Sequence, residues 1–143
     1  MTESTIQENA DLEKCIHFLN SIGIPTTFRK IEEGSFLPGL MIEKGGLVID
    51  KEALTHPGDI LHEAGHIAVT PGKKRPKMNH NSIVKSSHRE AEEMMAIAWS
   101  YAACIHLGLD PYFVFHDHGY KGGGDFIVEN FRDKKYFGTP MLQ

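Results

Sequence analysis

The chain has 143 residues, 41% hydrophobic and 24% charged, and this composition predicts one globular domain, residues 1–143, with a hydrophobic core. Its net charge of −4, with histidines neutral, gives no electrostatic reason to expect a nucleic acid partner. The polar, acidic start is unlike a signal peptide, and no apolar run approaches the ~20 residues of a membrane span, so we expect a cytoplasmic protein without a membrane partner.

The first 50 residues predict a helix followed by a small sheet. Apolar residues recur at helical spacing over residues 6–22, after a Ser4-Thr5-Ile6-Gln7 segment typical of a capping box. Three strands are predicted over residues 26–32, 36–43 and 47–50, with a hairpin turn at Lys44-Gly45-Gly46. We expect these strands to form a small antiparallel sheet.

The next predicted helix starts within residues 55–59, with Pro57 at a first helical position, and stops at Pro71-Gly72; it carries His62-Glu63-Ala64-Gly65-His66. Residues four apart lie on one face of a helix, so His62 and His66 can bind one metal ion together. Glu63 lies about 100° further round the helix, close enough to reach a water on that ion. The polar segment 71–83, rich in proline, glycine, asparagine and lysine, predicts a loop.

A long helix is predicted from Ala91 to about Leu107, after a second capping box at Ser87-His88-Arg89-Glu90. It is apolar nearly all round, which is typical of a helix buried at the centre of its domain. Cys15 and Cys104, far apart in helical patterns, predict buried free thiols. A polar loop follows at 116–124, and residues 125–131 predict a last short helix.

The metal chemistry requires a third ligand from later in the chain. A hydrolytic zinc site typically uses three protein ligands and a water, whose pKa the metal lowers from ~16 to about 7. Val69 and Gly72 stand where a metzincin has glycine and histidine, which excludes that class. Glu93 is favoured because it shares a stripe with the small residues Ala96 and Ser100, which allow a close helix contact. Five alternatives stay open: Glu92, Glu90, His116, Asp117 and His118.

The order of these parts resembles the ImmA/IrrE-type metallopeptidases over about residues 28–103. In that family the second helix carries a ligand glutamate, then alanine at +3, an aromatic residue at +6 and a small residue at +7. Glu93, Ala96, Trp99 and Ser100 match this pattern, whereas Ile97 stands where the family usually has asparagine. The resemblance implies a zincin-like zinc peptidase with Glu93 as the third ligand.

We therefore expect an α+β, zincin-like fold, with a small antiparallel sheet packed on a metal-binding helix and a buried central helix. The expected function is a zinc-dependent hydrolase, a narrow-specificity peptidase that acts on a peptide or protein substrate. His62, His66 and Glu93 would bind Zn²⁺, Glu63 would act as general base, and Tyr120 and His118 would assist by stabilising an oxyanion. The alternative is a metal-bearing regulatory or protein-interaction domain without activity.

Overall fold

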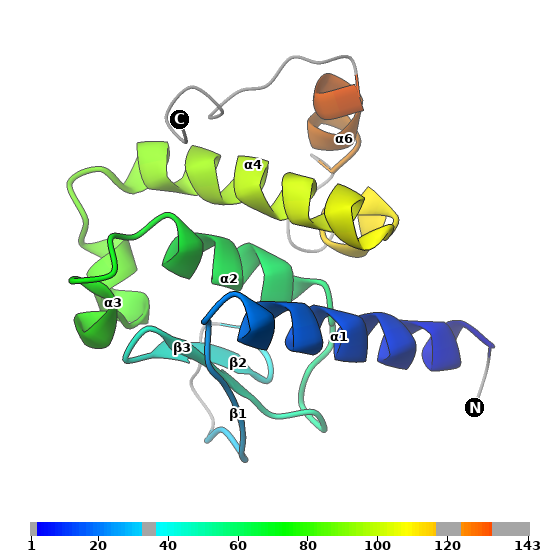
Figure 1. Cartoon of the computed structure of the whole chain (residues 1–143), viewed down its shortest axis with the longest axis horizontal. Helices are drawn as coiled ribbons and strands as arrows, with labels where there is room; N and C mark the ends of the chain where they lie inside the picture. The colour runs from blue at the N-terminus through cyan, green and yellow to red at the C-terminus, as the bar shows by residue number, and fades with distance from the viewer. Residues whose placement is uncertain (1–2, 33–36, 117–123, 133–143) are drawn as a thin grey trace.

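The computed structural model describes residues 3–32, 37–116 and 124–132 and shows a mixed α+β fold. The three-stranded sheet lies beneath α2, and α4 covers α2 from the other side (Figure 1). None of the helices in these ranges combines the length and apolar character that a membrane span needs. The elements in chain order are α1 (Glu3–Ser21), β1 (Thr26–Phe28), β2 (Leu40–Glu43), β3 (Gly46–Ile49), α2 (Asp59–Ala68), η1 (Arg75–Lys77), α3 (His80–Val84), α4 (Arg89–Leu107), η2 (Pro111–Phe113) and α6 (Gly124–Arg132).

The sheet has the order β1-β3-β2, with the fully buried β3 at its centre. β2 and β3 form the predicted antiparallel hairpin, and Lys44 and Gly45 in its turn have the positive φ values of 51° and 78° that a tight hairpin requires. β1 pairs with β3 in the parallel direction, so the expectation of a purely antiparallel sheet is wrong. The connection from β1 to β2 is longer than a tight turn, so β1 is not held beside β2. It pairs instead with the edge of β3 opposite β2.

The contact between α2 and α4 depends on Gly65. A β-carbon at this position would lie 2.8 Å from the backbone oxygen of Ala96, so only glycine permits this separation of the two helices. On its other side α2 buries Ile60, Leu61 and Ile67 completely, facing the core that it shares with the sheet. The segment from His62 to His66 therefore lies on a helix held between two layers.

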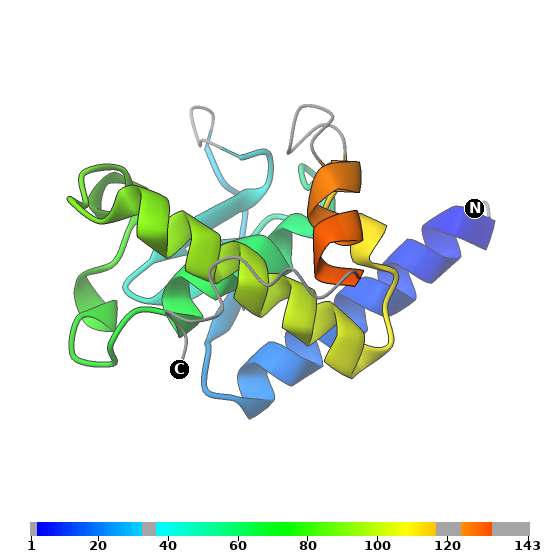
Figure 2. The same ribbon diagram turned by 90° about the horizontal axis from the view of Figure 1, so that it is seen from above.

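α4 is less enclosed than predicted. Seen from above, α4 lies over α2, and α6 lies on the outer side of α4 (Figure 2), where the rings of Tyr101 and Phe131 stack with centroids 4.7 Å apart. Ala96 and Cys104 are buried, but Met94 and Ile105 are 37% and 55% exposed. The expectation of a helix buried all round is therefore wrong, because apolar content alone does not reveal which sides other elements cover.

Both predicted capping boxes are wrong. Ser4 already lies inside α1. At the start of α4 the N-cap is His88 and makes no side-chain cap, whereas Ser86 accepts a hydrogen bond from the His88 backbone N–H at 3.2 Å. The predicted loop 71–83 contains η1 and α3, and a reciprocal Asn79–Ser82 capping box begins α3.

Other local predictions are confirmed. Gly108 ends α4 with a left-handed backbone, φ 71°, and α6 covers the predicted last helix. Cys15 and Cys104 are free and buried, and burial is the main cause that raises the pKa of each thiol to about 12.

Replacing Gly65 by alanine should destabilise the protein. Overpacking against a backbone atom costs about 1–3 kcal/mol, and the higher helix propensity of alanine returns at most about 1 kcal/mol. We expect a net loss in the free energy of unfolding, measured by urea denaturation. Gly72→Ala is the matched control, since nothing lies within 4 Å of its added methyl; equal stability of the two variants would contradict the close contact.

Candidate metal centre

One face of α2 carries four ionisable side chains: Asp59, His62, Glu63 and His66. The helical repeat brings them together, since positions three and four residues apart share a face. The ring centroids of His62 and His66 are 5.2 Å apart, and ligand atoms of His62, Glu63 and His66 all lie within 4.8 Å of one another. This group could hold a metal ion.

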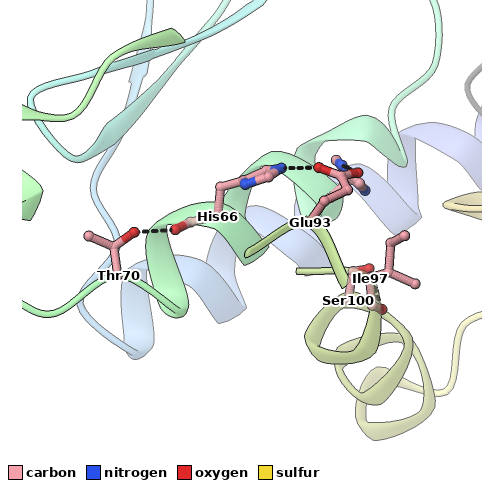
Figure 3. A network of polar contacts seen from close by, with 6 residues as sticks. His66, Thr70, Glu93, Ile97 and Ser100 are labelled. Atoms are coloured by element: carbon pink, nitrogen blue, oxygen red, sulfur yellow. Dashed lines mark hydrogen bonds and ion pairs between the residues drawn. The ribbon is translucent and has the colours of Figure 1, made fainter. Parts of the chain in front are cut away.

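Glu93 reaches the same point from α4. Its Oε1 lies 3.0 Å from His62 Nε2. Its Oε2 lies 2.8 Å from His66 Nε2, the contact that Figure 3 shows. Ligand atoms around one tetrahedral zinc ion lie about 3.3 Å apart, given zinc–ligand distances of about 2.0–2.2 Å. The distance from the carboxylate to each imidazole is therefore close to the spacing of two ligands on one metal ion.

The other candidates for a third ligand differ in their positions. Glu92 accepts a hydrogen bond from Ser86 Oγ at 2.9 Å, and Glu90 is exposed at the first turn of α4. His116 contacts Asp59. Asp117, His118 and Tyr120 lie outside the described residues, so the roles expected for His118 and Tyr120 stay predictions.

Hydrogen bonds at the end of α2 hold His66 in place. Thr70 Oγ1 donates to the His66 carbonyl at 2.7 Å (Figure 3). Arg75 donates from Nε to the Thr70 carbonyl at 2.9 Å and from Nη2 to the Ala68 carbonyl at 3.2 Å. These bonds satisfy carbonyls that the helix end leaves open, and they tie α2 to η1.

The ionisable side chains at the site shift one another's pKa values. Burial alone would lower the pKa of His62, but the hydrogen bond and charge of Glu93, with the nearby Glu63 and Asp59, outweigh it and raise that pKa. Burial likewise would raise the pKa of Glu93, but the hydrogen bonds from the two histidines hold it well below the usual range. Burial raises the pKa of Glu63 despite the opposing histidines. Glu93 is thus an anion at neutral pH, and Glu63 has a greater affinity for a proton than an ordinary glutamate.

The sequence interpretation missed a pair beside this site. His116 Nε2 lies 2.6 Å from Asp59 Oδ1, and the His116 ring stacks on His56 with centroids 4.1 Å apart. The segment that carries His116 packs tightly on the start of α2, where a β-carbon at Gly58 would overlap the Phe113 carbonyl. Asp59 and His116 are 57 residues apart, and no local pattern signals their contact.

A pocket of about 300 Å³ opens over the site. The helices α2, α3 and α4 provide most of its walls, and Leu37 provides the rest. Its lining residues are Leu37, Asp59, His62, Glu63, His66, His80, Ile83, Val84, Arg89, Glu93 and Ile97.

Comparisons of this chain with protein-family models, with curated proteins and with solved structures found no match. The resemblance to the ImmA/IrrE-type metallopeptidases therefore rests on the residues that carry it, and the site is interpreted below from its own geometry.

Metal binding should weaken at acidic pH. His62 must be neutral to bind a metal, and its pKa in the metal-free protein is raised, so protons compete at a higher pH than for a free histidine. Below that raised pKa we expect the affinity for Zn²⁺ to fall about tenfold per pH unit, measured by calorimetric titration. His80→Ala, which changes a pocket histidine outside the ligand group, should keep the same profile. Equal affinity for Zn²⁺ at acidic and neutral pH would contradict the prediction that protons compete with the metal for His62.

Proposed function

We propose that this protein is a zinc-dependent hydrolase of the zincin type, acting on peptides or proteins. The observation that carries the proposal is the convergence of one α4 carboxylate, that of Glu93, on both Nε2 atoms of the α2 histidines, at 3.0 and 2.8 Å. Two imidazoles and one carboxylate are a ligand set typical of catalytic zinc, whereas structural zinc sites use four ligands, mostly cysteines.

The donor chemistry fits zinc. His62, His66 and Glu93 would hold the ion, and when bound it supplies a Lewis acid that acidifies water and polarises a carbonyl. The low pKa of Glu93 keeps its carboxylate charged, as a metal ligand requires. A matching arrangement is expected from the ImmA/IrrE resemblance, in which the second helix supplies this glutamate.

Glu63 is suited to move the proton. It follows His62 directly on α2, faces the same pocket, and has a raised pKa caused mainly by burial. A carboxylate with a raised pKa binds a proton more readily than an ordinary one, so it can accept a proton from water and donate it to a leaving amine. A site that binds metal only for structure has no use for such a group, which favours an enzyme over a metal-bearing interaction domain.

Purified protein should contain about one zinc ion per chain, since a catalytic site of this kind binds a single ion. His62→Ala and Glu93→Ala should both lose it, because each removes one of three ligands. Elemental analysis of the three proteins measures this directly. Glu90→Ala, which removes an exposed acid from the same helix turn, should keep the metal. Full zinc retention in Glu93→Ala would reject Glu93 as a ligand.

Glu63→Gln should keep zinc and lose hydrolysis. The amide preserves the shape of the side chain but cannot accept a proton, and general-base catalysis contributes about 10²–10⁴-fold. The measurement is the cleavage rate of a mixed peptide library by the zinc-loaded protein, followed by mass spectrometry. If Glu63→Gln and wild type both function in the cell while His62→Ala does not, the interaction-domain alternative is correct.

A further inference from the structure

The pocket over the metal centre differs between its two ends. α2 and α4 run in opposite directions (Figure 1), so Asp59, one turn before His62, and Arg89, one turn before Glu93, lie at opposite ends of the site. Arg89, Glu93 and Ile97 are spaced four residues apart and form one stripe along the pocket wall. The site therefore has an acidic end and a cationic end, with the metal ligands between them.

The two ends also differ in whether their charged groups have an ion-pair partner among the described residues. At one end Asp59 is paired with His116 at 2.6 Å, and in the middle Glu93 is paired with both histidines. Arg89 is exposed and makes no ion pair with another described residue. It is also the one lysine or arginine among the pocket-lining residues in the described ranges. An anionic group entering the pocket would thus find its partner at Arg89.

Aliphatic side chains from separate parts of the fold line the same pocket. Ile83 and Val84 come from the short helix α3, and Leu37 comes from the segment before β2. Val84 is 39% exposed although it is apolar. An isolated bridge between Glu43 and Asn79 holds the start of α3 against the edge of the sheet, so this wall is attached to the fold. An apolar surface in a pocket with a few polar groups is typical of a site that binds an aliphatic group.

We propose that the pocket selects peptides with an aliphatic side chain beside the scissile amide and a carboxylate within about two residues of it. The aliphatic side chain packs against Leu37, Ile83 and Val84, and the carboxylate pairs with Arg89. The spacing follows from one helical turn of about 5.4 Å between Glu93 and Arg89 and about 3.3 Å per extended residue. The inference rests on the proposed function, since it names the substrate class of that site.

Binding tests this selection separately from cleavage. The zinc-loaded Glu63→Gln protein keeps the proposed ligands and lacks the base, so it can be titrated with fluorescent hexapeptides whose C-terminus is amidated. The reference peptide has leucine and, two residues away, glutamate in an alanine background. We expect about tenfold weaker binding when glutamate is replaced by glutamine or leucine by serine. A further peptide, with glutamine and a free C-terminal carboxylate, distinguishes an acidic side chain from a chain end as the source of the charge.

Protein variants assign the preference to Arg89. Adding Arg89→Gln should remove the preference for glutamate, and Arg89→Glu should reverse it in favour of a lysine peptide. Lys85→Gln is the matched control, because it removes an exposed cation nearby that does not line the pocket. Equal binding of all peptides, or an unchanged preference in Arg89→Gln, would overturn the inference.

The two proposals fail in different ways. Selective, Arg89-dependent binding by a protein whose wild type cleaves none of the peptides would leave the recognition standing and reject the peptidase. Cleavage by wild type without any preference for the aliphatic or acidic residue would leave the peptidase standing and reject the recognition.

Discussion

The distance between α2 and α4 governs this structure, and Gly65 governs that distance. With no side chain at Gly65, the backbone of Ala96 approaches α2 directly. Only at this separation can a glutamate side chain on α4 reach the Nε2 atoms of both histidines. The sheet on one side and α4 on the other hold α2 in its place, so the arrangement of His62, His66 and Glu93 is a property of the packing.

The charges of the site follow from the same packing. Charged groups that leave water are costly unless they are paired, and two of the three acids that line the pocket have a histidine within hydrogen-bond distance. Glu93 is hydrogen-bonded by His62 and His66, and Asp59 by His116. Glu63 differs: it lies near both histidines without a side-chain hydrogen bond to a described residue, and burial raises its pKa. The packing thus gives two neighbouring glutamates opposite tendencies, one to stay charged and one to take up a proton.

The region between α2 and α4 does more than connect them. Arg75 donates hydrogen bonds to carbonyls at the end of α2, and α3 carries part of the aliphatic wall of the pocket. The features that could perform chemistry lie on α2 and α4, and the features that could select a substrate lie on α3, on Arg89 and at Leu37. Arg89 is the first residue of α4 itself, but α3 and Leu37 lie outside α2 and α4 and can alter selection without moving these helices, a division common where a rigid scaffold supports a variable connection.

The sequence by itself determined the local features, which depend on residues close together in the chain. Helical spacing puts His62, Glu63 and His66 on one face, Gly108 ends α4, and the tight turn makes β2 and β3 a hairpin. The pattern also favoured Glu93, through the small residues that share its stripe. Only the tertiary structure decided the rest: the parallel direction of β1, the helix α3 in a segment that reads as a loop, the exposed side of α4, and the Asp59–His116 pair. These four features depend on contacts between segments that are distant in the sequence. Local residue spacing does not predict such contacts, because strand pairing and burial depend on the packing of the whole chain.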